Sequence, residues 1–146
     1  LGTEAGITTD LIVGFPGETE ADFQATIDAV RRVRYSDAFT YAYSPREGTA
    51  AAKMMDSIPQ DEKIRRLNEL IAVEREIITS RRIERLGRDE AVIGESLNDK
   101  NSSEIIGKNG LGQSVIFAGT EGDLGRILTV KMTRVQGSTL IGDVVA

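Results

Sequence analysis

The sequence of 146 residues contains no cysteine and no histidine. The chain therefore forms no disulfide, offers no thiolate to an iron–sulfur cluster and lacks the commonest nitrogen ligand of metals. Its apolar runs all fall short of the roughly 18 residues that a membrane span needs, and no charged segment followed by an apolar one resembles a leader. We therefore expect a cytoplasmic protein with no membrane contact.

Basic residues are also scarce, because 18 Lys and Arg stand against 23 Asp and Glu, for a net charge of −5. Residues 1–58 carry 5 basic and 9 acidic groups, residues 59–88 carry 8 and 6, and residues 89–146 carry 5 and 8. A nucleic-acid binder that relies on bulk electrostatics has a broad basic face, so any RNA contact must be local. These three segments are also the domains that we expect.

Residues 1–58 read as a strand, a helix and a second parallel strand. An apolar strand over residues 7–13 runs into a glycine turn, and Thr19 is suited to cap the helix that follows. Aromatic residues alternate along the second strand, residues 38–43. One right-handed crossover of this kind is a fragment of a barrel rather than a whole one, and we expect its sheet to be covered on both faces. Ligands bind at such strand-to-helix turns, although a tight loop without a ligand fits equally well.

Residues 59–88 predict one long connecting helix, which begins near Pro59 and ends before Gly87. Beyond it, short apolar runs alternate with turn residues, which indicates a small antiparallel barrel. The predicted strands cover residues 90–96, 104–108, 114–118, 125–134 and 140–145. The fold class expected is thus an α/β partial-barrel fragment followed by a small all-β barrel.

Two runs carry a family resemblance: Thr9 to Thr19 (TDLIVGFPGET) and Asp37 to Thr49 (DAFTYAYSPREGT). Both resemble the radical S-adenosylmethionine methylthiotransferases, and the second run is similar to their tRNA-modifying branch. Residues 89–146 resemble the TRAM domain, a small RNA-binding barrel that this family carries. The resemblance implies an enzyme that converts isopentenyladenosine next to the tRNA anticodon to its 2-methylthio form. It implies S-adenosylmethionine and two 4Fe-4S clusters as cofactors and the tRNA anticodon stem-loop as partner.

The same resemblance implies which residues face the cofactor. Ile12 and Gly14 would lie against the adenine, Gly17 and Glu18 would close the turn, and the backbone at Ala42 and Tyr43 would complete the site. From the residues alone, an ordinary core isoleucine is the favoured interpretation of Ile12, and an aromatic residue on a strand usually packs in a core.

RNA contacts are expected from five positions: Arg46, Lys108, Asn109, Lys131 and Arg134. Arg46 follows a proline in a loop, where a guanidinium binds phosphate or carboxylate, although a surface salt bridge is as plausible. Where the TRAM loop normally has arginine this sequence has Lys108, and Gln113 removes a further cation, so strong autonomous tRNA binding is not expected. The three barrel cations form a candidate phosphate-binding patch, or else they are solvated charges at strand edges.

Because the chain starts at Leu1, almost at a strand, and lacks the cluster-binding cysteines, we expect the C-terminal part of a longer enzyme, inactive alone. Two alternatives remain. One is the sister branch, which modifies an aspartate of a ribosomal protein and would suit the acidic balance of residues 89–146. The other is a non-catalytic binding module. In every case we expect self-association or domain swapping through residues 1–58, since a two-strand sheet leaves an apolar face open.

Overall fold

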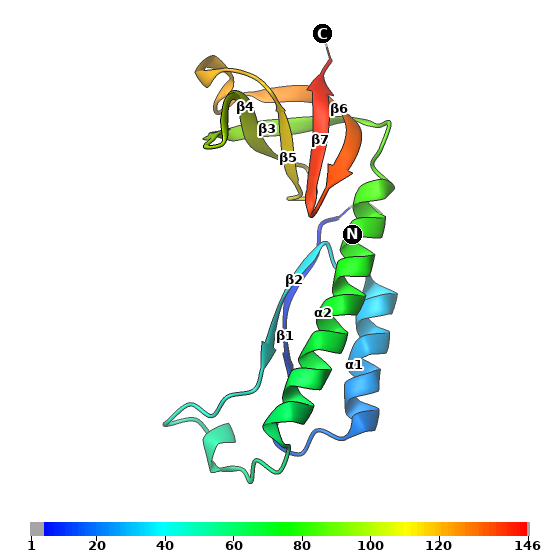
Figure 1. Ribbon diagram of the computed structural model, residues 1–146, viewed down its shortest axis with the longest axis vertical. Helices are drawn as coiled ribbons and strands as arrows, with labels where there is room; N and C mark the ends of the chain where they lie inside the picture. Colours follow the sequence, from blue (N-terminus) through cyan, green and yellow to red (C-terminus); the bar gives the residue numbers. More distant parts are fainter. Residues whose placement is uncertain (1–4, 146) are drawn as a thin grey trace. The chain divides into compact units, whose positions relative to one another are not determined.

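The computed structural model describes residues 5–145 and divides into two compact units. Residues 8–77 form one unit, which contains a parallel strand pair and is called the α/β unit. Residues 78–145 with residues 5–7 form the other, which contains five strands and is called the barrel unit. Figure 1 shows both. The division falls within the helix that the sequence predicts as a connector.

One strand–helix–strand crossover forms the base of the α/β unit. Strands β1 (Thr8–Val13) and β2 (Asp37–Ala42) are parallel, and helix α1 (Glu20–Val33) connects them. After a long loop, helix α2 (Gln60–Ile83) runs beside α1 on the same side of the strands (Figure 1). The core side chains of the α/β unit, each at most 8% exposed, are Val13, Phe23, Ile27, Val30, Leu70 and Val73. The strands and the helix that the sequence predicts for residues 1–58 are therefore confirmed.

The other face of the strand pair is open. Ile12, Phe39 and Tyr41 project from it and expose 53%, 63% and 50% of their surface. The register pairs Ile12 with Tyr41, and because alternate side chains of a strand share a face, all three lie on one side. The sequence predicts a sheet covered on both faces, whereas the described residues supply helices to only one.

Helix α1 begins with a complete capping box. The Thr19 hydroxyl accepts a hydrogen bond from the Asp22 N–H at 3.1 Å, and the Asp22 carboxylate accepts one from the Thr19 N–H at 2.9 Å. The Thr19 hydroxyl also donates to the Asp22 carboxylate at 2.7 Å, and this bond, together with the one from the Thr19 N–H, holds the pKa of Asp22 below its ordinary value. The cap predicted at Thr19 is confirmed, and the pair satisfies amide groups that the helix itself leaves unbonded.

Replacing Thr19 with alanine should lower the stability of the α/β unit by about 1 kcal/mol, because the Asp22 N–H loses its acceptor. Urea unfolding followed by tyrosine fluorescence measures the loss, since Tyr35, Tyr41 and Tyr43 all lie in this unit. Thr26→Ala is the matched control. The Thr26 hydroxyl only bonds back to the Asp22 carbonyl inside the helix, so its removal should cost much less. Equal losses in the two variants would contradict the capping role.

A buried carboxyl group lies on α2 of the same unit. Glu74 is 7% exposed, and its Oε1 has no hydrogen-bond partner among the described residues. Burial raises the pKa of Glu74 above its ordinary value of 4.5, and the nearby Asp37 carboxylate raises it further, while a bond from the Ala38 N–H opposes both. The folded state thus holds the Glu74 proton more tightly than the unfolded state does.

Replacing Glu74 with glutamine should therefore stabilise the α/β unit at neutral pH by about 1 kcal/mol, the order of an unmet buried polar group. The pKa of Glu74 is higher in the folded state than in the unfolded state, where it is 4.5, so Glu74 favours folding below pH 4.5. This contribution to stability is lost as the pH rises through the pKa of the folded state. The gain from Glu74→Gln should therefore shrink as the pH falls through the folded pKa of Glu74 and should be smallest below 4.5. Urea unfolding at pH 7 and pH 4 measures it, with exposed Glu76→Gln as control. A gain of equal size at both pH values would contradict the argument.

Five strands form the closed barrel: β3 (Asp89–Asn98), β4 (Asn101–Asn109), β5 (Ser114–Ala118), β6 (Ile127–Gln136) and β7 (Thr139–Val144). Their order around the barrel is β3-β4-β5-β7-β6, and every neighbouring pair is antiparallel except β5 and β7, which are parallel. The predicted small barrel is confirmed, with this one parallel pair as the difference from a purely antiparallel one.

The barrel has its own hydrophobic core. Seven residues, each at most 1% exposed, form it: Val92, Ile105, Val115, Phe117, Val130, Met132 and Leu140. Along β6, Val130 and Met132 point inward while Lys131 between them is exposed. The strand predicted over residues 125–134 is therefore confirmed, with one face buried and the other exposed.

Candidate functional site

A pocket of about 570 Å³ lies where β1 and β2 end. Parallel strands place their carboxyl ends at the same edge, so the turn after β1 and the loop after β2 meet here. The lining residues are Ile12, Phe15, Tyr41, Ala42, Tyr43, Ser44, Arg46, Thr49 and Ala51. The two sequence runs that carry the family resemblance thus form one pocket.

Aromatic and apolar groups dominate the lining, with a single cation. The rings of Phe15 and Tyr43 meet edge to face, with centroids 5.3 Å apart, and Tyr41 is half exposed at the opening. Arg46 is the one charged residue among the lining groups. Such a wall suits a flat heterocycle and an anionic group, so it fits the adenine and the carboxylate of S-adenosylmethionine. It does not fit an iron–sulfur cluster, because the chain contains no cysteine.

Three of the residues assigned to the cofactor are not among the lining groups: Gly14, Gly17 and Glu18. The Glu18 carboxylate accepts a hydrogen bond from the Gly14 N–H at 2.9 Å, which closes the turn. Both glycines have positive φ, 71° and 86°, a conformation that other residues rarely adopt. The structure thus gives these three a role in shaping the turn, and their cofactor contact stays a prediction, as does that of Ile12, Ala42 and Tyr43.

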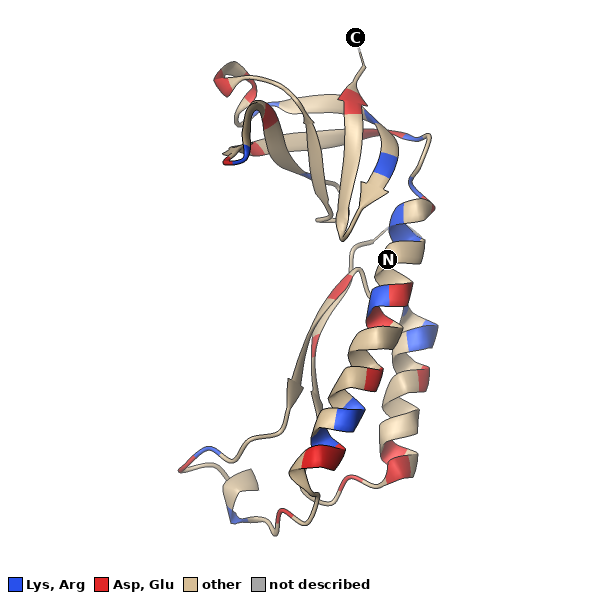
Figure 2. Cartoon of the chain, in the orientation of Figure 1, with Lys and Arg blue, Asp and Glu red and all other residues tan. Residues whose placement is uncertain are grey.

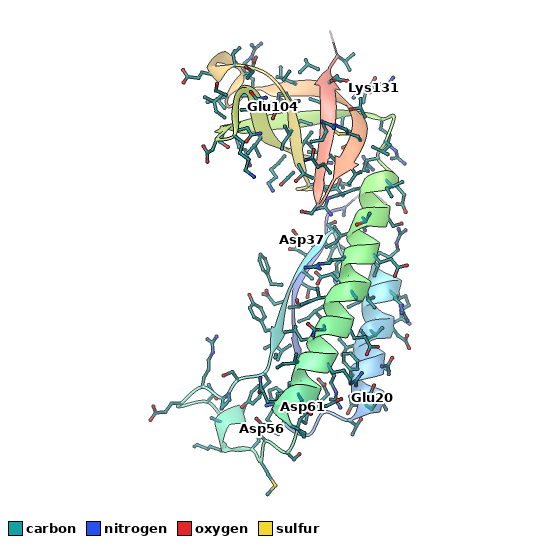
Figure 3. The ribbon with its side chains drawn as sticks, in the orientation of Figure 1. Glu20, Asp37, Asp56, Asp61, Glu104 and Lys131 are labelled. Carbon is teal, nitrogen blue, oxygen red and sulfur yellow. The ribbon has the colours of Figure 1, made fainter. Side chains whose placement is uncertain are left out.

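Two buried cations of α2 bind the turn after β1 and the loop that leads into α2. Arg66 donates to the Glu18 carboxylate at 2.6 Å and to the Glu18 carbonyl at 3.1 Å. Lys63 pairs with Asp56 at 2.5 Å, on the loop that leads into α2 (Figure 3). The two cations are 6% and 3% exposed.

Sequence reasoning missed both cations. The apolar Ile64 of this helix is 47% exposed, whereas the buried stripe runs Lys63, Arg66, Leu70, Val73. The spacing of three, four and three residues marks this stripe in the sequence, yet charged residues in a stripe normally indicate a solvated face.

The three cations predicted as a phosphate patch are not gathered in the barrel unit. Lys108 pairs with Ile93 of β3, whereas Lys131 pairs with Asp89 of the same strand, four residues away. Lys131 also faces Asp143 of β7, so it lies between two carboxylates. Figure 2 shows the barrel's basic residues interspersed with acidic ones. Arg134 is exposed on β6, and the Lys108 ammonium donates to the Ser114 hydroxyl at 2.8 Å.

Comparison with known families decides what this barrel is. The model of the TRAM domain matches residues 83–145. The chain contains a TRAM domain. Its five strands all lie within that range, so the predicted TRAM resemblance is confirmed.

Curated relatives extend the similarity beyond the TRAM domain. A tRNA-2-methylthio-N(6)-dimethylallyladenosine synthase of Clostridium novyi (strain NT) is 36% identical over 140 residues, 96% of this chain and 31% of the relative. The protein of the same name from Delftia acidovorans (strain DSM 14801 / SPH-1) is 39% identical over 142 residues, 97% of this chain and 32% of the relative. The family resemblance stated from the sequence is thereby confirmed. The chain spans about a third of the length of these relatives.

The loop between β4 and β5 of the TRAM domain is organised around Asn109, which is 5% exposed. Its Oδ1 accepts from the N–H groups of Leu111 and Gln113, at 3.1 and 2.9 Å. Its Nδ2 donates to Glu90 at 2.7 Å and to the Gln113 side chain at 2.9 Å. Sequence reasoning assigned Asn109 to RNA, and the structure shows its polar atoms engaged within the domain.

Across residues 5–145, no helix is sufficiently long and apolar to traverse a bilayer.

Proposed function

We propose that this chain is the C-terminal part of a tRNA methylthiotransferase that converts isopentenyladenosine beside the anticodon to its 2-methylthio form. The observation that carries the proposal is the pocket at the ends of β1 and β2, formed by the two runs that resemble the family. The names of the relatives, whose aligned parts cover nearly the whole of this chain, support the same activity.

In this proposal Ile12, Ala42 and Tyr43 form one wall of an S-adenosylmethionine site. Ile12 offers an apolar surface, half of which is exposed, and the aromatic pair of Phe15 and Tyr43 closes the pocket beside it. When bound beside its cluster, the cofactor supplies the radical and the methyl group of the reaction. The residues of this chain orient the adenosyl group and exclude water from it, while Arg46 binds an anionic group of the cofactor or of the RNA.

The chain supplies no ligands for the two 4Fe-4S clusters of the proposed enzyme. Thiolates hold such clusters, and the sequence contains no cysteine. We therefore propose that these residues act within a longer polypeptide and are inactive alone.

The TRAM domain would contact the anticodon stem-loop. Of the three predicted barrel cations, Lys108 and Arg134 are better placed for phosphate contacts than Lys131, which lies between Asp89 and Asp143. With so few cations the affinity of the domain alone should be weak and depend only modestly on salt. RNA recognition in this proposal belongs to the whole enzyme, with the TRAM domain as one contributor.

Deletion of the gene that encodes this chain, followed by mass spectrometry of tRNA nucleosides and ribosomal proteins, tests the function. The expected result is loss of the 2-methylthio nucleoside and accumulation of isopentenyladenosine, with ribosomal proteins unchanged. Loss of a methylthio group from a ribosomal-protein aspartate would instead support the sister activity, which the acidic balance of residues 89–146 favours, at 8 acidic to 5 basic groups. No change in either the tRNA nucleosides or the ribosomal proteins would favour the alternative of a non-catalytic binding module.

A further inference from the structure

The pocket wall after β2 is carried by a long loop, residues 43–58, most of which is exposed. Arg46 and Thr49 of the wall are exposed, and one turn of 3₁₀ helix, Ala51–Lys53, is the loop's regular structure. Its internal bonds are local: the Thr49 N–H and hydroxyl both donate to the Arg46 carbonyl, at 3.2 and 2.8 Å. Such a loop needs an anchor if it is to hold the pocket wall in one place.

Lys63 supplies that anchor from α2. Among the described residues, the ion pair between the Lys63 ammonium and Asp56, at 2.5 Å, is the only salt bridge that joins this loop to the rest of the unit. The Lys63 side chain is 4% exposed and that of Asp56 30%. A pair shielded from water in this way is screened far less by salt than a surface pair.

The same ammonium lies over the ring of Tyr43, 5.2 Å from its centroid. Tyr43 is 8% exposed, and its hydroxyl has no hydrogen-bond partner within the described chain. Hydrogen bonding therefore does not fix the ring. The contacts that do are the edge-to-face contact with Phe15 and the cation above the ring.

The stem of Lys63 also passes against the turn after β1. A Cβ built on Gly14 would lie 2.6 Å from Lys63 Cγ, so the two are packed as closely as the absence of a side chain permits. One residue outside both family runs thus touches each of them: Gly14 in the first, Tyr43 in the second.

We propose that Lys63 is a positioning residue for the pocket. Together with Asp56 and Tyr43 it forms a clamp, the Lys63 clamp, that sets the Tyr43 ring and holds the loop carrying Arg46. The residue acts through these neighbours and is not itself among the lining groups. The expected effect of Lys63 on ligand binding rests on the proposed function, whereas its expected effect on the loop does not.

Limited trypsin digestion of the 146-residue chain tests the clamp directly, because cleavage after Arg46 and Lys53 reports on the loop. Lys63→Met should speed cleavage at both sites at least tenfold and change the NMR signals of the Tyr43 ring, while Lys63→Arg should largely restore both. Arg65→Met is the matched control. Arg65 is the neighbouring cation but pairs with Glu20, Glu62 and Glu69, away from the loop. If Lys63→Met fails to fold, Asp56→Asn provides the same test with the lysine in place. Unchanged cleavage and Tyr43 signals in folded variants would overturn the clamp.

The full-length gene product then tests the link to the ligand. Lys63→Met should raise the KM for S-adenosylmethionine or tRNA about tenfold, with kcat changed less than threefold, and Lys63→Arg should restore KM. A loosened loop with unchanged KM would overturn the positioning role. If the unaltered protein does not thiolate tRNA, the proposed function fails, and cleavage and the Tyr43 signals alone decide the clamp.

Discussion

Replacing Gly142 with alanine is expected to destabilise the barrel by about 3 kcal/mol, which is the upper range for overpacking a core. Gly142 lies on β7 and pairs with Met132 of β6. A Cβ at this position would lie 2.5 Å from Val130 Cγ1 and 2.6 Å from the Lys131 carbonyl oxygen. The carbonyl belongs to the strand ladder and cannot move without breaking it, so the clash cannot be relieved by a side-chain rotation.

Hydrogen exchange at the amides of β3 to β7, with urea unfolding followed by circular dichroism, measures this loss. Gly110→Ala is the matched control in the same barrel. A Cβ there meets nothing within 4 Å, so that variant should stay within about 0.5 kcal/mol of the parent. Tyrosine fluorescence gives an internal check, because the three tyrosines lie in the α/β unit and their transition should not shift. Gly142→Ala with parent-like protection in β6 and β7 would contradict the packing argument.

Much of the fold was predictable because its signals are local. The capping residue Thr19 and the spacing of Phe23, Ile27 and Val30 define α1, and the alternation along residues 127–136 defines the face of β6. Each depends only on residues a few positions apart, where the period of a helix or strand acts directly. The parallel pairing of β5 with β7 depends instead on barrel closure, which no local pattern records.

The sequence could indicate which residues run into the pocket, although their ligand contacts stay predictions, but it did not indicate which residues of another element support the pocket. Ile12, Ala42, Tyr43 and Arg46 come together, since consecutive parallel strands end at one edge. Lys63 and Arg66 went unnoticed because a charged residue on a helix is usually solvated, and only the tertiary structure brings Glu18 and Asp56 to them. The RNA contact expected of Asn109 stays a prediction, whereas the structural role of its buried amide, which holds the loop between β4 and β5 together, was not predicted.

Asn109→Ala should accordingly destabilise the TRAM domain by about 3 kcal/mol. The substitution removes the acceptor of the Leu111 and Gln113 N–H groups and the donor that Glu90 Oε2 uses. Leaving a buried polar group without a partner costs about 1 to 3 kcal/mol, and Gln113 is only 3% exposed. Urea unfolding with hydrogen exchange in β4 and β5 measures the change.

Asn101→Ala is the control that separates burial from residue type. The Asn101 side chain also accepts a backbone bond, from the Ser103 N–H at 3.2 Å, but it does so in an exposed hairpin where water can replace it. The loss of stability in Asn101→Ala should therefore be below about 1 kcal/mol.

Glu90 pairs with both Arg85 and Asn109, so the effects of Glu90→Gln and Asn109→Ala on stability should be non-additive. The double variant should lose less stability than the sum of the two single losses. Strictly additive losses of stability would show that Asn109 stabilises the loop without a contribution from the Glu90 carboxylate.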